Sequence, residues 1–235
     1  MKSGKPGLPS LSAALAGIPA GIQTFGPWNG RRQLFVKFAV EAETATIYTA
    51  EALRGELVRL TARSRYHSVA IVGDDVLAES DFLVAAFGKA APLPVMLDHD
   101  GQRPEALEGL LHALALVQVT LDGSEGAAAV ERACASVELA AKKQVEHAVV
   151  IVPGAALSDG PLLRIVEQMH RVSDEVQIMV HPVIERAPEH DRRWVHWHEQ
   201  AMAVHPDVRI QPRWPLNGRP ANPEQPGAGN PQRAH

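Results

Sequence analysis

The stretch LPVMLDHDGQRPEALEGLLHALALVQVTLD, residues 93–122, holds one complete strand–helix–strand repeat and decides the fold class. Its two apolar runs, 93–98 and 116–122, are almost continuously hydrophobic, which is typical of parallel strands covered on both faces. Between them, Pro104 and Glu105 precede the run ALEGLL and mark the start of a helix. Strand, helix and strand in this order predict an α/β fold built on a parallel sheet.

The same unit recurs along the chain. Thr49, Ser80 and Ser158 stand at helix starts, where a side-chain oxygen can cap free backbone N–H groups. About six strand–helix units follow one another, and such repetition builds either a barrel, closed or partial, or an open doubly wound sheet. Periodicity alone does not choose between these two folds. The other predicted strands are 34–40, 68–73, 147–152, 176–183 and 208–212.

The chain has 235 residues, of which 46% are hydrophobic, enough for one domain with a continuous core. Residues 1–20 contain repeated glycine and proline and are predicted to form a flexible segment. Residues 217–235 are rich in glycine, proline and asparagine and lack any large apolar side chain. Because such a segment buries too little apolar surface to offset its ordering entropy, we expect a disordered tail. The folded domain is therefore predicted to span residues 21–216.

Charge and cysteine content limit the classes of partner. A formal net charge of −4 gives no general attraction to nucleic acid or to an anionic membrane surface. No run of about 18 apolar residues predicts a membrane span. Cys134 is the only cysteine, which excludes an internal disulfide and a metal site made of cysteines alone. A cytoplasmic protein is the expectation.

Several strand ends form an ordered series of short motifs. Residues 22–48 read IQTFGPWNGRRQLFVKFAVEAETATIY, a glycine-containing loop followed by Phe35-Val36-Lys37. The later segments are Gly73-Asp74-Asp75-Val76, Asp98-His99-Asp100-Gly101, VQVTLDG (117–123) and HPV (181–183). In order and spacing they resemble the radical S-adenosylmethionine enzymes, nearest the 7-carboxy-7-deazaguanine synthase-like group. The resemblance covers about residues 21–216 and implies a single partial (β/α)6-type barrel with flexible termini.

The resemblance also implies a cofactor that this chain is not equipped to hold. Radical S-adenosylmethionine enzymes use a four-iron cluster held by three cysteines spaced C-x3-C-x2-C, and those positions fall on Glu41, Ala45 and Tyr48. Thiolates are the ligands of such clusters, and Cys134 lies far along the chain. We therefore expect neither cluster nor radical reaction. The leading hypothesis is a degenerate member, a pseudoenzyme that acts as a binding or regulatory component.

Candidate ligand-binding residues stand at the carboxyl ends of the predicted strands. The resemblance implies that Gly73-Asp74-Asp75-Val76 corresponds to the family's Gly-Gly-Glu-Pro motif, which recognises the amino group of the methionine moiety. No cofactor is predicted, because S-adenosylmethionine would lose its iron chelation and the glutamate of that motif is replaced by Asp74 or Asp75. Two alternatives remain open: an enzyme that uses the strand-end carboxylates to hold Mg²⁺ for a small anionic substrate, and a protein that binds a purine-like ligand. Aspartate after a strand is also a common turn former or helix cap. The candidates are Gly73, Asp74, Asp75, Asp98, Gly101 and Asp122.

A final hypothesis concerns a protein partner. Trp194 and Trp197 are three residues apart and can share one helix face, with Arg193 beside them. Tryptophan and arginine dominate the energetics of many interfaces, so this face is a candidate binding patch. Packing of the same face on the sheet is the alternative.

Overall fold

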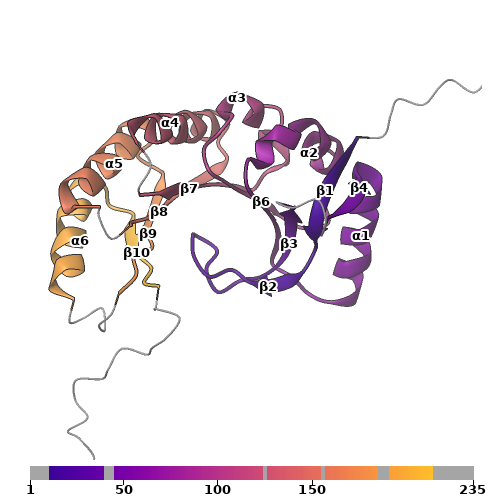
Figure 1. Cartoon of the computed structure of the whole chain (residues 1–235), viewed down its shortest axis with the longest axis horizontal. Coiled ribbons are helices and arrows are strands. Elements are labelled where there is room, and N and C mark those ends of the chain that lie inside the picture. Colours follow the sequence, from indigo (N-terminus) through magenta and orange to yellow (C-terminus); the bar gives the residue numbers. More distant parts are fainter. Residues whose placement is uncertain (1–10, 40–44, 124–125, 155–156, 185–190, 214–235) are drawn as a thin grey trace, which may run out of the picture.

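The computed structural model describes residues 11–39, 45–123, 126–154, 157–184 and 191–213 (Figure 1). Within these residues, ten strands form one mixed sheet accompanied by six α-helices. The strands are β1 Ser12–Gly17, β2 Ala20–Ile22, β3 Arg32–Phe38, β4 Thr46–Thr49, β5 Ser68–Val72, β6 Val95–His99, β7 Leu116–Asp122, β8 Glu146–Val152, β9 Gln177–Val180 and β10 Val208–Ile210. The helices are α1 Ala50–Arg63, α2 Ser80–Phe87, α3 Pro104–Leu107, α4 Ala127–Lys142, α5 Asp159–Val172 and α6 Arg192–Val204. Two 3₁₀ turns, η2 Val76–Glu79 and η3 Leu111–Ala113, complete the set.

The parallel strands lie side by side in chain order. The parallel strands are β3, β5, β6, β7, β8, β9 and β10, and each of them pairs with the next parallel strand along the chain. The strand order therefore never reverses, as it does at the switch point of a doubly wound sheet, and that alternative is not observed. The described sheet does not close on itself, because β10 and β4 are its two ends.

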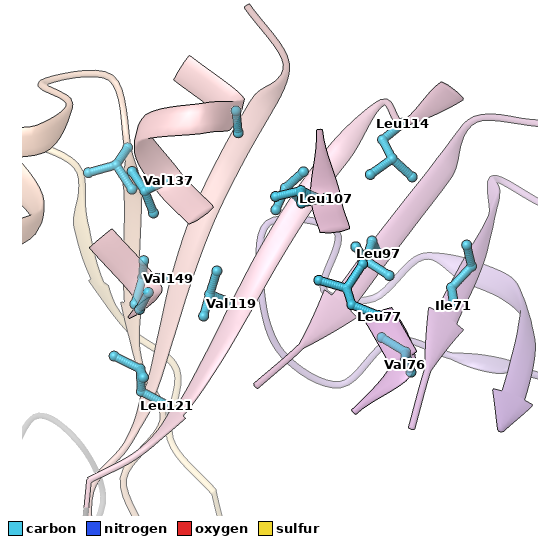
Figure 2. Close-up of a cluster of buried hydrophobic side chains, with 14 of the residues drawn as sticks. Ile71, Val76, Leu77, Leu97, Leu107, Leu114, Val119, Leu121, Val137 and Val149 are labelled. Atoms are coloured by element: carbon cyan, nitrogen blue, oxygen red, sulfur yellow. The ribbon is translucent and has the colours of Figure 1, made fainter. Parts of the chain in front are cut away.

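The sheet curves into an arch, and the helices cover its outer side (Figure 1). Alternate strand residues point outward, so Val95 and Leu97 of β6 join the buried residues of the helices in one large apolar core. Figure 2 shows this outer core, where Leu97 and Val119 of the sheet lie near Leu107 and Val137 of the helices. The outer core is the main store of buried apolar surface and hence of folding free energy.

The helices begin where their capping residues predict. Thr49 caps α1, its Oγ1 accepting a hydrogen bond from the Ala52 N–H at 3.1 Å, and Ser158 stands at the N-cap of α5. Helices α2 and α3 begin at Ser80 and Pro104 as predicted, but the N-cap of α2 is Glu79, and neither this residue nor Ser158 makes a side-chain capping hydrogen bond. In the described part of the chain no helix is long and apolar enough to cross a membrane.

The predicted domain boundary at residue 21 is wrong. Strand β1 begins at Ser12 and pairs antiparallel with both β3 and β4. Its Ala13 and Leu15 side chains are buried in the outer core. Glycine and proline suggested a flexible segment, but the small residues of SAALAG fit closely against neighbouring strands. The remainder of the predicted flexible segment, residues 1–10, and the predicted tail, 217–235, lie outside the described residues.

Candidate functional site

The inner side of the arch carries a separate and smaller apolar cluster. Its buried members come from the strand positions that alternate with the outer core, for example Met96 of β6 and Leu116 of β7. Phe25 and Trp28 pack against this cluster. Both belong to residues 23–31, the loop between β2 and β3, which reaches across the inner side of the arch (Figure 1). We call these nine residues the bridging loop.

Two contacts fasten the bridging loop to the far end of the sheet. The Gly26 N–H donates to Gln211 Oε1 at 2.7 Å, and Gln211 Nε2 donates back to the Gly26 carbonyl at 3.0 Å. Phe25 lies against the His181 ring, with centroids 5.3 Å apart. Gly26 has a φ of +83°, and a Cβ on it would lie 1.9 Å from Gln118 Oε1, so only glycine fits. The loop thus covers the inner cluster from β7 to the end of β10.

Beside this cover lies a group of three polar side chains, Asp98 near the carboxyl end of β6 and Gln118 and Thr120 in the middle of β7. We call it the Asp98 group. Thr120 Oγ1 donates to Asp98 Oδ1 at 2.7 Å, and Gln118 Nε2 makes a long contact of 3.5 Å with Thr120 Oγ1. Because Thr120 accepts from the amide, its own proton is available for the carboxylate. Asp98 is the acceptor at the end of this relay.

Burial is the dominant influence on the Asp98 carboxyl. Desolvation raises its pKa to about 6, while hydrogen bonds from Thr120 and Gln118 act in the opposite direction. No charged neighbour contributes to the shift. A carboxyl that changes charge near pH 6 inside a strand-end site is a typical feature of binding and catalytic sites.

The residues beside the Asp98 group are partly apolar and partly charged. The register that sets Lys37 opposite Val72 and Ile71 opposite Leu97 sets Val72 next to Asp98. Val72 and Val152 are half-buried and pack against the inner cluster. Lys37 is exposed. The arrangement can hold a small molecule by hydrogen bonds on one side and apolar contact on the other.

The predicted strand-end residues divide between the two sides of the sheet. Asp122 lies on β7 two residues beyond Thr120, so its exposed side chain projects to the inner side with Asp98. Asp75 instead pairs with Arg103, at 2.8 Å between Oδ1 and Nε, in the loops before η2 and α3. Gly101 belongs to the outer side, since a Cβ there would meet the Ala133 backbone of α4.

Gly73 and Asp74 form the turn after β5. Gly73 has a φ of +151°, and a Cβ on it would lie 2.8 Å from Phe38 Cβ, so its role is close backbone packing. Asp74 is exposed. Of the six candidates, Gly73 and Gly101 thus have packing roles, Asp75 forms an ion pair with Arg103, and Asp98 and Asp122 lie on the inner side.

Sequence reasoning missed Gln118 and Thr120. The signal was present in VQVTLD, where polar residues two apart interrupt an otherwise apolar strand and must lie on one face. Gln211 could not have been found in this way, because its partner Gly26 is 185 residues away in the sequence.

The carboxylates do not assemble into a metal site among the described residues. No three histidine, cysteine, aspartate or glutamate side chains there lie close enough together to hold one ion. Asp98 and Asp122 share the inner side, but a Mg²⁺ site needs further oxygen ligands in near-octahedral positions. The described geometry thus gives the metalloenzyme alternative no direct support.

The iron–sulfur cluster of the radical S-adenosylmethionine enzymes does not fit the residues present. Ala45 lies just before β4 and Tyr48 lies on it, and neither side chain offers a thiolate. Glu41 lies outside the described residues. Cys134 is on α4 with its Sγ 3.8 Å from Met169 Sδ, on the helix side of the sheet. Burial raises the pKa of the Cys134 thiol, which disfavours the thiolate.

Comparison with known proteins does not assign this chain to a family. No model of a known protein family matches it, and no curated protein does. Functional inference therefore depends on the strand-end segments and on the geometry of the inner side.

The predicted partner patch on α6 is wrong. Trp197 is fully buried and Trp194 nearly so, and the two rings meet edge to face with centroids 5.9 Å apart. Arg193 lies over the Trp194 ring and pairs with Asp159 of α5 at 2.9 Å. The helix face that carries these residues packs on the sheet, because burying two indole rings stabilises the domain more than exposing them.

Proposed function

We propose that this chain is a partial barrel of the radical S-adenosylmethionine type that lacks the iron–sulfur cluster and serves as a small-molecule-binding or regulatory component rather than as a catalyst. The inner side of the arch, next to the Asp98 group, is the binding site. The resemblance implies an iron–sulfur cluster, but the chain lacks the three thiolates that would bind it. The proposed binding function does not need a cluster.

The sheet supports the barrel part of the proposal. Parallel strands in unbroken chain order with helices on one side are what a barrel-type winding produces, and an arch open on one side is compatible with a partial barrel. In such folds ligands bind at the carboxyl ends of the strands. Asp98 lies near the carboxyl end of β6.

The observation that carries the binding proposal is the Asp98 group itself. A carboxyl whose pKa is raised by burial, held by Thr120 and Gln118, is costly to place in a half-buried position unless something uses it. The Asp98 group lies beside the apolar inner cluster, and the hydrogen-bonded pair Gln33 and Ser68, which is also buried on this side, lies toward the amino ends of the strands. A polar group surrounded in this way is typical of a ligand site, in which a few polar side chains fix the orientation of a ligand held by apolar contact.

A thermal-shift screen of a metabolite library, including S-adenosylmethionine and guanine, tests the proposal. We expect at least one compound to raise the melting temperature by about 5–10 °C at a hundredfold excess over its Kd. The Thr120→Val variant should lose this rise. Thr61→Val is the matched control, because the Thr61 hydroxyl bonds only to backbone carbonyls within α1.

Two results would contradict the proposal. One is a screen in which no compound stabilises the wild type more than Thr120→Val. The other is the finding of stoichiometric iron and sulfide with charge-transfer absorption after anaerobic reconstitution, since a bound cluster would indicate a radical enzyme instead of a binding protein. Cys134→Ala should leave the iron content of the reconstituted protein unchanged, because that thiol lies on the helix side.

A further inference from the structure

We propose that the Asp98 group selects an organic cation, a flat or compact ligand that presents an ammonium or amidinium nitrogen to the Asp98 carboxylate. This inference rests on the proposed binding function and names the ligand class for the same site. Three observations carry it: the direction of the hydrogen-bond relay, the missing countercharge and the apolar walls.

The relay leaves the site with acceptors rather than donors. The Thr120 hydroxyl donates its hydrogen bond to Asp98 Oδ1, and the Gln118 amide N–H points to Thr120 Oγ1. A carboxylate has about four lone-pair positions, so Asp98 keeps acceptor capacity after these two neighbours are counted. Gln118 is fully buried and its Oε1 lies beneath Gly26 of the bridging loop, so the acceptor that remains for a ligand is the Asp98 carboxylate. The complement of such a set is a group rich in N–H donors.

The Asp98 carboxylate also lacks a countercharge. In the parts of the chain that the structure describes, no lysine, arginine or histidine forms an ion pair with it. Among the described residues, the charged or titratable groups on the inner side include the exposed Lys37 and Asp122, the buried His181, Glu146 at the amino end of β8 and Arg209 of β10, and none of them shifts the Asp98 pKa. Partly buried charges are normally paired, so a cationic ligand supplies what the protein does not.

The walls of the site favour an organic cation over a hydrated metal ion. Val72, which the sheet register puts next to Asp98, is half-buried and packs against the inner cluster, as do Phe35 of β3 and Phe25 and Trp28 of the bridging loop. Mg²⁺ dehydrates reluctantly and keeps several waters, which apolar walls do not hydrogen-bond. An aromatic amidinium buries its ring against such walls and offers its nitrogens to the carboxylate.

Benzamidine and benzamide provide the test, because they have nearly the same shape and differ in charge. We expect ligand-observed NMR at pH 7.5 to show benzamidine binding about tenfold more tightly than benzamide. In Asp98→Asn the two affinities should become about equal. This variant keeps the side-chain shape and the acceptor for Thr120, and its melting temperature verifies that it is folded. Lowering the pH from 7.5 to 5 should weaken benzamidine binding to the wild type about tenfold, because Asp98 takes up a proton near pH 6.

Asp100→Asn is the control of equal charge change. Its carboxylate bonds to the Gln102 backbone and side chain, away from the inner side, and the preference for benzamidine should persist. Equal affinity of the wild type for both probes, or undetectable benzamidine binding, overturns the cation proposal. So does a rise in melting temperature with MgCl₂ alone that Asp98→Asn removes. If a neutral or anionic library compound nevertheless binds in a Thr120-dependent manner, the binding function stands and only the ligand class is wrong.

Discussion

The two sides of one sheet differ in what their residues do, and strand β6 shows this within two positions. Leu97 points to the outer side and joins a core to which all six α-helices contribute buried side chains. Met96 points to the inner side and belongs to a cluster of six fully buried residues covered by the bridging loop. The outer side is sealed by regular elements, whereas the inner side is sealed by a loop that ends beside polar groups.

The next two residues of β6, Asp98 and His99, also face opposite sides of the sheet, and burial shifts the pKa of each. Asp98 faces the inner side and its pKa is raised by burial, while His99 faces the outer side and burial lowers its pKa to about 4. Both are therefore favoured in the neutral form by the folded protein. Stability thus depends chiefly on the outer side, and polar groups that can serve binding lie on the inner side.

Truncation of the two apolar neighbours on β6 should give the largest effect. Leu97→Ala is expected to lower the free energy of unfolding toward the upper part of the range of about 2–5 kcal/mol, because helices hold the surrounding side chains in place and a cavity remains. Met96→Ala should fall near the lower end, since the bridging loop can settle into the space. Urea denaturation measures both. Val58→Ala, at an exposed position on α1, should change stability by less than about 0.5 kcal/mol. Equal losses for Leu97 and Met96 would show that the loop seals its side as firmly as the helices do.

The bridging loop itself offers a matched pair of glycines. Gly26 and Gly30 have φ values of +83° and +80°, but only a Cβ at Gly26 meets another side chain, Gln118. Gly30→Ala should cost about 1 kcal/mol from backbone strain alone. Gly26→Ala should cost about 2–3 kcal/mol and release the contacts with Gln211, because Gln118 must be displaced as well. Chemical denaturation gives the energies, and hydrogen exchange at the Gly26 amide reports the release. Identical behaviour of the two variants would contradict the role assigned to Gln118.

Asp98→Asn comes last in this order because it is expected to gain stability rather than to lose it. The folded-state pKa of about 6 lies above the ordinary value of 3.8, so wild-type Asp98 makes stability fall as the pH rises from about 4 to about 6. Removing this penalty should stabilise the variant at pH 7 by on the order of 2 kcal/mol. The gain should shrink toward zero near pH 4.

His99 acts with the opposite slope and separates the two sides of the sheet. Its pKa falls from 6.5 to about 4, so its contribution to stability is full above pH 6.5 and is lost as the pH falls toward 4. Burial lowers the pKa values of His67, His181 and His205 in the same direction. Denaturation curves of Asp98→Asn between pH 4 and 7 should therefore show a steeper loss on acidification than the wild type. A gain that is greatest at pH 4 would reverse the assignment for Asp98.

Local sequence determined the parallel strands from β3 to β10 within a few residues, but not the antiparallel strands β1, β2 and β4. The run 116–122 is strand β7 as predicted, and the capping residue Thr49 starts α1, because apolar periodicity and side-chain capping act over a few residues. The absence of the cluster thiolates could also be read directly, since one cysteine cannot supply three ligands. Strand β1 was missed because its pairing with β3 and β4, and not its composition, makes it a strand.

Only the tertiary structure decided which polar residues meet. Sequence reasoning named six strand-end candidates, and the structure puts Asp98 on the inner side of the sheet and Gly101 against α4 on the outer side. The curvature of the sheet lets Gly26 reach Gln211 and places the bridging loop over the inner cluster. Contacts of this kind depend on the position of the whole chain in space, because a hydrogen bond across 185 residues leaves no periodic trace in the sequence.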